Sequence, residues 1–421
     1  MRELGYEVAY ISWPGINACY KIRLGATFSE DVWREAVCTL CERHPHLTSL
    51  IATDEQGRRY FKDGGTVALE FYPAGAIDWF SWYLREDAEP FDIEHGPMVK
   101  LLIITGETQT DLVLFAAHIL GDGTAWLNVT RDLFAGLGGN MPSGVLEMPQ
   151  SIRLKGSLFL PVRLYLSYHT RRFNRFWRQN PRIFTAEEHR DFLRRYHAQH
   201  PTELRFIELD SDTLLALRKA CKTAGVTINT AVAITFFRAL QTQGDERVRV
   251  GVSADFRYDI RQDLSLHMGN FVTGFMIEDT AAENIPRKLQ RILTSRTKRH
   301  EVVAFLERLD STLIEAGMHS AYDGFHNEVS QKLADVMKSS SDCRSFGISN
   351  LGRQSFPNLG FEVEEFWHVV PLSTIYDLNI GLVTLDDTMR MCVRYATSAL
   401  SENEADALIN HVVTALKNFK L

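Results

Sequence analysis

A short and almost uninterrupted apolar run at residues 111–119, DLVLFAAHI, constrains the fold more than any other part of the sequence. It is too short for an ordinary α-helix and is typical of a strand buried inside a sheet. Residues 121–123, GDG, follow as a turn. Beyond the turn, apolar residues recur at helical spacing from Trp126 to Leu137. The segment therefore predicts a strand, a turn and a helix, with His118 where the strand ends.

The chain has 421 residues, which is more than one hydrophobic core supports, because cores stop growing near roughly 250–300 residues. Strand and helix patterns alternate in both halves, so we expect a mixed α/β protein with a first half at 1–178, a linker at 179–202 and a second half at 203–421. The other predicted strands are Tyr20–Leu24, Val67–Phe71, Val99–Ile104, Leu204–Leu209, Val248–Val252 and Ser345–Ser349, with an extended segment at Val369–Leu372 and a hairpin at Leu378–Tyr395. The other predicted helices follow Ser29 or span Thr213–Thr223, Asn229–Thr242 and Glu402–Phe419.

The composition is that of a globular protein, with 45% hydrophobic and 24% charged residues. A formal net charge of -7 argues against a nucleic-acid binder, whose binding surface is strongly basic. The N-terminal residues lack the apolar core of a signal peptide, and no apolar run approaches the ~18–20 residues of a membrane span. We therefore expect a cytoplasmic protein with no nucleic-acid partner and no transmembrane segment.

Six cysteines are scattered along the chain, which is not the pattern of a disulfide framework, so reduced thiols are expected. Cys38 and Cys41 form a CxxC pattern inside a predicted helix, and no second ligand pair lies nearby in the sequence. We interpret them as two buried helix residues rather than as metal ligands or a redox pair. No metal is assigned.

A basic stretch runs from Phe159 to Tyr196, across the end of the first predicted half and into the linker, and in it Arg171, Arg172 and Arg175 are interleaved with aromatic residues. Three interpretations give it a function: contact with the phosphates of a ligand, contact with an acidic protein, or contact with a membrane surface. The alternative is a solvated helix with an aromatic inner face. The sequence leaves these interpretations open.

His118 is the candidate catalytic residue, because an imidazole with a pKa near ~6.5 can take a proton at neutral pH from an attacking hydroxyl or amine. Asp122 follows four residues later and is better placed to form an ion pair that holds the loop than to act on the same substrate. Gly123 gives the backbone conformational freedom at the turn and leaves room beside the imidazole.

The HxxxDG pattern of His118, Asp122 and Gly123 resembles the signature of the condensation-domain superfamily, which includes peptide-synthetase condensation domains, chloramphenicol acetyltransferase and stand-alone lipid acyltransferases. Further segments resemble other elements of that family in the same order. They are Arg43–Leu47 (RHPHL), Glu89–Ile93 (EPFDI) with Gly96 and Pro97, Asp255–Arg257 (DFR) and Met268–Val272 (MGNFV). Together these segments span most of the chain.

The resemblance implies two chloramphenicol-acetyltransferase-like halves arranged as a V, with a central tunnel and His118 near its middle. It also implies an acyl donor that is a thioester of coenzyme A or of a carrier protein's phosphopantetheine. Arg171, Arg172 and Arg175 are then the candidate contacts for the phosphates of coenzyme A or for an acidic carrier protein. No tightly bound cofactor is expected, since the thioester is a substrate. The acceptor would be a small molecule or a lipid with a hydroxyl or an amine.

The sequence also departs from the family pattern. Ala117 stands where peptide-synthetase condensation domains usually carry a second histidine, which reduces the weight of amide synthesis between carrier proteins. Leu47 is followed by Thr48 rather than by the family's arginine, so Arg257 becomes the candidate partner of Asp122. Ser349 begins an SNLG segment similar to that of stand-alone alcohol acyltransferases.

The sequence says less about the roles of two further residues, Asn270 and Ser349. Asn270 is expected to support the site as part of a packed crossing between the halves, rather than to contact substrate. Ser349 could donate a hydrogen bond to the oxyanion, or it could be a structural residue at the end of a strand.

The resemblance favours an acyltransferase that works by direct attack, without an acyl-enzyme, because no serine or cysteine has the sequence setting of an activated nucleophile. A second interpretation keeps the fold but makes the protein a non-catalytic module that binds or recruits a carrier protein. A third is a membrane-associated lipid-binding protein.

Overall fold

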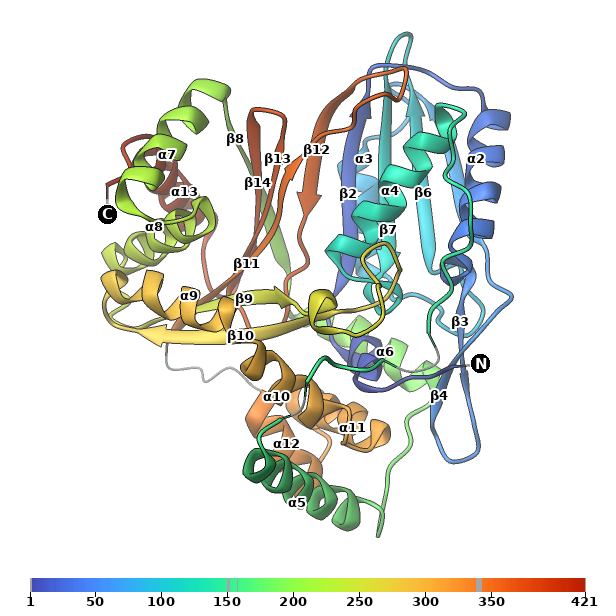
Figure 1. Cartoon of the computed structure of the whole chain (residues 1–421), viewed down its shortest axis with the longest axis vertical. Helices are drawn as coiled ribbons and strands as arrows, with labels where there is room; N and C mark the ends of the chain where they lie inside the picture. The colour runs from blue at the N-terminus through green and yellow to red at the C-terminus, as the bar shows by residue number, and fades with distance from the viewer. Residues whose placement is uncertain (1, 150–151, 157, 338–342, 421) are drawn as a thin grey trace.

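The computed structural model describes residues 2–149, 152–156, 158–337 and 343–420, and in these two large sheets lie side by side (Figure 1). The five-stranded sheet of the first half has the order β12 (Val363–Val369), β2 (Asn17–Leu24), β7 (Thr110–Ala117), β6 (Val99–Thr105) and β5 (Val67–Pro73). The six-stranded sheet of the second half has the order β10 (Val272–Asp279), β9 (Val248–Asp255), β11 (Arg344–Gln354), β13 (Leu378–Leu385), β14 (Thr388–Ala396) and β8 (Thr202–Leu209). A small sheet consists of β1 (Arg2–Glu3), β4 (Arg59–Lys62) and β3 (Leu50–Thr53).

Most of the apolar run at 111–119 lies in β7, which ends at Ala117 and is a central strand covered on both faces. Leu112 and Leu114 pack in the core that includes α2 (Glu30–Arg43) and α4 (Gly123–Leu137). Val113 and Phe115 pack against α3 (Trp79–Ala88) on the opposite face. Because both faces are buried, the strand needs apolar residues at every position and shows no polar alternation.

The six-stranded sheet is covered by helices that the sequence predicted, namely α7 (Ser211–Ala224), α8 (Ile228–Thr242) and α13 (Glu402–Lys417). Gly225 divides α7 from α8 and has a φ of 67°, the left-handed conformation in which glycine carries no steric penalty. The predicted cap of α2 is also present, since the Ser29 side chain accepts a hydrogen bond from the Val32 backbone.

β12 joins the two halves, because it belongs to the second half in sequence but pairs antiparallel with β2 in the first (Figure 1). In this register His368 lies opposite Tyr20. The predicted extended segment Val369–Leu372 overlaps this strand only at Val369.

A helical cluster that the strand pattern did not predict lies below the two sheets in Figure 1. It contains α5 (Leu160–Trp177), α6 (Ala186–Gln199), α10 (Arg296–Leu306), α11 (Ser311–Tyr322) and α12 (Glu328–Met337). In sequence α9 (Ile285–Thr294) comes directly before α10. The segment expected as a linker, 179–202, therefore contains α6, with His189 and Phe192 buried. The boundary between the halves stays a prediction.

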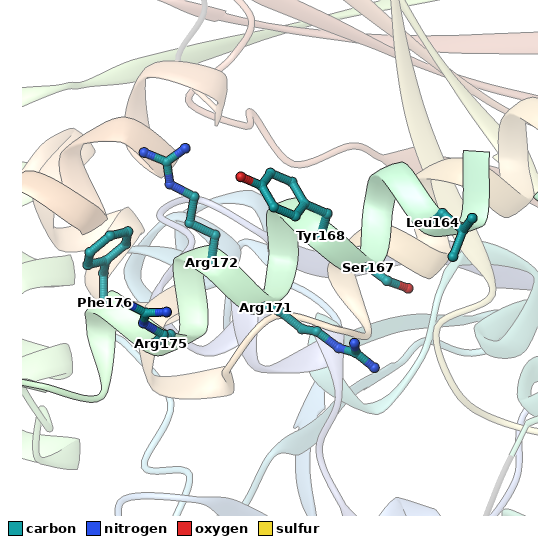
Figure 2. A pocket seen from close by; sticks show the side chains of 7 residues that line it. All are labelled: Leu164, Ser167, Tyr168, Arg171, Arg172, Arg175 and Phe176. Carbon is teal, nitrogen blue, oxygen red and sulfur yellow. The ribbon is translucent and has the colours of Figure 1, made fainter. Parts of the chain in front are cut away.

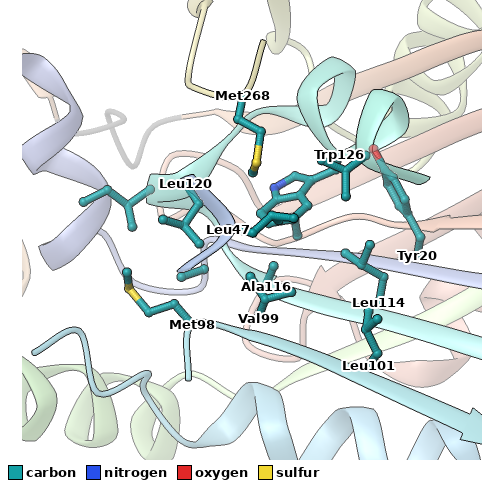
Figure 3. Packing of buried hydrophobic residues seen from close by; sticks show 14 of the residues in the cluster. Tyr20, Leu47, Met98, Val99, Leu101, Leu114, Ala116, Leu120, Trp126 and Met268 are labelled. Atoms are coloured by element: carbon teal, nitrogen blue, oxygen red, sulfur yellow. The ribbon is translucent and has the colours of Figure 1, made fainter. Parts of the chain in front are cut away.

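The first-half core also receives a residue from the second half. Figure 3 shows Met268 beside Leu120 and Trp126, and all three are buried in one cluster. The prediction for the CxxC residues is wrong in part: both lie on α2, but Cys38 is exposed and Cys41 is half-buried. The buried face of α2 is built instead from Trp33, Ala36, Val37 and Leu40.

No single helix in the described ranges is long and apolar enough to cross a membrane. α7 and α8 meet that test only as a pair, with a bend of 93° between them.

Candidate active site

The HxxxDG segment begins one residue beyond the end of β7. The ladder stops where Ala117 pairs with Asn17, the first residue of β2, so the strand has no partner beyond this point. His118 then opens a single turn of 3-10 helix, which corrects the prediction that the strand continues to Ile119. Asp122 caps α4, and its Oδ1 accepts a hydrogen bond from the Ala125 backbone at 3.0 Å.

Asn270 fixes the tautomer of His118. Its Nδ2 donates to the backbone oxygens of His118 at 2.8 Å and Ile119 at 3.0 Å, so its Oδ1 is directed to Nδ1 of His118, also at 3.0 Å. An amide oxygen only accepts hydrogen bonds, so Nδ1 of the neutral ring carries the proton. Nε2 is left with its lone pair, which is the form a general base requires.

The protonation equilibrium of His118 favours the neutral ring. Burial lowers its pKa below the ordinary value, while the Asp122 charge and the hydrogen bond to Asn270 oppose the shift. The imidazole is therefore able to accept a proton at neutral pH.

The predicted ion pair between Asp122 and Arg257 is confirmed. Nη2 of Arg257 lies 2.8 Å from Oδ1 of Asp122, and Nη1 lies 3.0 Å from Oδ2. Both side chains are buried, with exposed fractions of 2% for Arg257 and 1% for Asp122. Oδ2 also accepts a hydrogen bond from the Phe271 backbone at 2.7 Å. This bidentate pair connects the HxxxDG turn of the first half to the second half.

Gly269 allows the two halves to approach closely. Its backbone oxygen accepts a hydrogen bond from the Asp122 backbone at 3.2 Å. Its φ of 124° is a conformation that other residues rarely adopt, and a Cβ would lie 2.7 Å from Cε of Met148. The MGNF segment is thus a crossing between the halves, as predicted, and it also places Asn270 on the candidate catalytic ring.

Tyr6 and Tyr10 belong to the site although sequence reasoning did not select them. They lie on the N-terminal segment formed by η1 (Tyr6–Val8) and α1 (Ala9–Ser12). The Tyr10 ring stacks on His118 with 4.9 Å between centroids and 5° between planes. The Tyr6 hydroxyl donates to the backbone oxygen of Asn270. The i, i+4, i+7 spacing of Tyr6, Tyr10 and Trp13 was the available signal for one aromatic face.

His368 is a second imidazole near the site that the sequence analysis missed. Its pKa is lowered to about 4, mainly by burial and also by the His118 charge, while a hydrogen bond to the Ser349 backbone opposes the shift. Its ring packs against Tyr20 with 5.6 Å between centroids. The Tyr20 hydroxyl in turn donates to the Gly123 backbone oxygen at 2.7 Å. Only the pairing of β12 with β2 brings this histidine here, so no local pattern marked it.

The other predicted site residues are distributed as follows. Gly123 is the first residue of α4, and a Cβ there would lie 2.9 Å from Cδ2 of Leu351, so the residue provides close packing. Ser349 is half-buried on β11. Its proposed contact with an oxyanion stays a prediction. Among the residues that the structure describes, no group of three or more His, Cys, Asp or Glu side chains is placed to hold a metal ion.

The pocket beside His118 is small, at about 50 Å³. Its walls come from the N-terminal segment, from residues 90–93, from the end of β7 and from α6, and they include Tyr10, Trp13, Phe91 and Leu193. Since one water occupies about 30 Å³, the pocket holds about two waters. An acyl thioester therefore requires these side chains to move.

Arg171, Arg172 and Arg175 line a different pocket, of about 630 Å³, on the exposed face of α5 (Figure 2). The described lining residues of this pocket all belong to α5, and none of them lines the pocket at His118. The structure thus does not bring these arginines to the candidate catalytic residue, and their predicted contact with donor phosphates stays a prediction.

Solved structures with this fold cover nearly the whole chain. The first condensation domain of the calcium-dependent antibiotic synthetase has a TM-score of 0.66 at 13% identity, over 99% of this chain and 95% of that one. Trichothecene 15-O-acetyltransferase from Fusarium sporotrichioides has a TM-score of 0.65 at 15% identity, over 100% and 95%. The epimerization domain from the third module of tyrocidine synthetase B has a TM-score of 0.60 at 14% identity, over 97% and 93%.

No protein-family model matches the chain, and no curated protein sequence matches it. The structural similarity nevertheless confirms the predicted fold class: the chain is a mixed α/β protein with the two-halved fold of condensation domains and chloramphenicol-acetyltransferase-like enzymes.

Proposed function

We propose that the protein is an acyltransferase that moves an acyl group from a thioester to a hydroxyl or an amine, with Nε2 of His118 as the general base. The observation that carries the proposal is the hydrogen bond between Asn270 and Nδ1 of His118, because it selects the tautomer with a free Nε2. The similarity to an acetyltransferase and to condensation domains supports the same class of reaction.

In the proposed reaction, Nε2 takes the proton of the acceptor as its oxygen or nitrogen attacks the thioester carbonyl. The tetrahedral intermediate collapses, the carbon–sulfur bond breaks, and the imidazolium returns the proton to the leaving thiolate. The acceptor is acylated and the thiol is released, so no cofactor is consumed. Ser349 is retained as a candidate donor to the oxyanion.

Asp122 does not act on the ring of His118 in this scheme. Both of its oxygens are engaged by Arg257 and by backbone groups. Its part is to hold the turn against the second half, so that Asn270 stays within hydrogen-bonding distance of the His118 ring.

Substrate entry requires a conformational step. The pocket of about 50 Å³ is too small for a pantetheine arm, and Tyr10 covers one face of the imidazole. We expect the N-terminal segment 6–13 to move away from His118 when an acyl donor binds.

The proposal is tested by His118→Ala in single-turnover reactions, with acyl-coenzyme A or an acyl carrier protein as donor and panels of alcohols and amines as acceptors. Mass spectrometry of the products identifies the donor class and the acceptor class together. A positioned base contributes ~10²–10⁴ in rate, so the variant should lose that factor while keeping its circular dichroism spectrum. His95→Ala is the matched control, because its ring is exposed and contacts Asp92. A folded His118→Ala variant with the wild-type rate would refute the mechanism.

The alternative of a non-catalytic module that recruits a carrier protein is favoured by the small pocket alone. It predicts carrier binding by both the wild type and His118→Ala, with no acyl transfer by either. Detection of any transfer product that depends on His118 excludes it.

A further inference from the structure

The N-terminal half of α5 exposes large apolar side chains. Leu164 is 60% exposed and Tyr168 is 63% exposed, and Phe159, which precedes the helix, is 71% exposed. Leu160 and Tyr165 are more than half exposed as well. Single exposed apolar residues are ordinary on protein surfaces, but a contiguous group marks a surface that another body covers.

The C-terminal half of the same helix is basic. Arg171, Arg172 and Arg175 are exposed, and the structure records no carboxylate partner for them in the ranges it describes. The guanidinium groups of Arg172 and Arg175 lie 5.7 and 5.8 Å from the centre of the Phe176 ring. Residues 148–186 contain eight Arg or Lys and no Asp or Glu, in a chain whose net charge is -7. Arg178 and Arg182 in this stretch are paired with Asp310 and Glu188, so the uncompensated charge among the described residues that line the pocket on α5 is that of the three arginines on its exposed face.

The attachment of α5 leaves this face free. Trp177 is buried and donates from its indole to Oγ1 of Thr312 at 2.8 Å. Asn174 donates to the Arg308 backbone oxygen at 2.8 Å, and Arg178 pairs with Asp310 at 3.0 Å. These contacts are all in the last turn or just beyond it. Figure 1 shows α5 at the outer edge of the helical cluster, and Figure 2 shows Leu164, Tyr168 and Arg172 along the helix.

We propose that the outer face of α5, defined here as Phe159, Leu160, Leu164, Tyr168, Arg171, Arg172 and Arg175, docks the protein on an anionic lipid bilayer. Apolar and aromatic side chains enter the boundary between headgroups and acyl chains, and arginines bind lipid phosphates beside them. An acidic protein surface would match the arginines, but it would leave Phe159, Leu160 and Leu164 without an apolar partner. The bilayer satisfies both halves of the helix, and the inference does not depend on the transfer chemistry at His118.

Vesicle flotation of the full chain tests the proposal. We expect binding to vesicles of phosphatidylglycerol and phosphatidylcholine in equal parts, and weak binding to pure phosphatidylcholine. Each basic residue near an anionic surface contributes about 1 kcal/mol, or about fivefold in affinity. The variant R171Q/R172Q/R175Q should therefore bind on the order of a hundredfold more weakly, and wild-type binding should decline as salt is raised.

A charge-matched control is K222Q/R287Q/R291Q, which removes three exposed cations from α7 and α9 and should bind vesicles like the wild type. L164S/Y168S tests the apolar half without changing charge and should also lose binding. Circular dichroism establishes that each variant is folded.

The proposal is overturned if the wild type fails to float with anionic vesicles, or if the control loses as much binding as R171Q/R172Q/R175Q. It is also overturned, in favour of a protein partner, if vesicles are not bound while the same three arginines govern binding to an acidic acyl carrier protein.

Discussion

The turn after β7 and the outer face of α5 place arginine in opposite environments. Arg257 is buried, and its guanidinium binds both oxygens of Asp122 and lies 4.7 Å from the centre of the Phe271 ring. Arg171 and Arg172 are exposed beside Leu164 and Tyr168. A buried cation must have an internal partner, because an uncompensated buried charge is costly. An exposed cation among exposed apolar residues has no such requirement, and its surroundings indicate a partner outside the chain.

The largest expected effect on stability is at the buried arginine. Arg257→Met leaves Asp122 as an unpaired buried carboxylate, which costs about 3–5 kcal/mol. Arg172→Met removes the same charge from an exposed position and should cost less than about 0.5 kcal/mol. Urea unfolding followed by circular dichroism measures both values. Equal stability of the two variants would contradict the claim that Arg257, unlike Arg172, has an internal partner on which folding depends.

The buried histidine His368 should make the stability of the protein depend on pH, which an exposed side chain does not do to the same extent. The pKa of His368 is about 4 in the folded chain, mainly because of burial, and near ~6.5 in the unfolded chain. As pH falls, the His368 imidazole takes up its proton at a higher pH in the unfolded chain than in the folded chain. The contribution of this group to the free energy of unfolding is therefore complete above the unfolded pKa and is lost as the pH falls towards 4. The loss is about 3 kcal/mol for this group alone.

His368→Gln should remove that part of the pH dependence. Other buried histidines also contribute, such as His46, whose pKa burial lowers to about 3, so the informative quantity is the difference between variant and wild type. His95→Gln, at an exposed position, is measured beside it as the control for loss of a histidine side chain at the surface. An identical slope in wild type and His368→Gln between pH 4 and about 6.5 would contradict the assigned environment.

The sequence predicted the parts of the site that depend on local pattern. The strand, the turn and the helix around His118 were predicted from an apolar run and a helical repeat. Arg257 was predicted as the partner of Asp122 because Thr48 stands where the resembling family has an arginine. Tyr10 and His368 could not be predicted in this way. Their positions depend on how the N-terminal segment folds over the site and on the pairing of β12 with β2, which are long-range contacts without a local signal.

The same reasoning explains the errors in the fold. The helices α9 to α12 lie between β10 and β11, which are strands of one sheet, so a strand count along the sequence passes over them. Cys38 was predicted as buried from its place inside a helix. Burial in α2 depends instead on which face meets α4, and Cys38 lies on the other face.

A smaller effect is expected from Asn270→Asp. A carboxylate in place of the amide stabilises the imidazolium of His118, whose pKa burial otherwise lowers, so the pKa of the ring should rise. More of the base is then protonated at neutral pH, and the acid limb of the pH–rate profile moves to higher pH. A rise of about one unit, from a value that lies below the ordinary ~6.5, still leaves at least about a quarter of the rings neutral at pH 7, so we expect a loss of rate of up to about threefold. An NMR titration of His118 gives the same shift without activity, and an unmoved pKa would contradict the assigned tautomer and contact.

The smallest effect is expected for R171Q/R172Q/R175Q in the absence of lipid. These side chains make no ion pair among the described residues and line a pocket separate from the one at His118. The free energy of unfolding should change by less than about 0.5 kcal/mol, and the affinity for a water-soluble acyl donor should stay within about twofold of the wild type. Isothermal calorimetry at two salt concentrations measures that affinity. A large loss of donor affinity, with a flatter salt dependence, would show that the arginines hold donor phosphates, as the sequence first suggested, and that α5 and the His118 site act on one ligand.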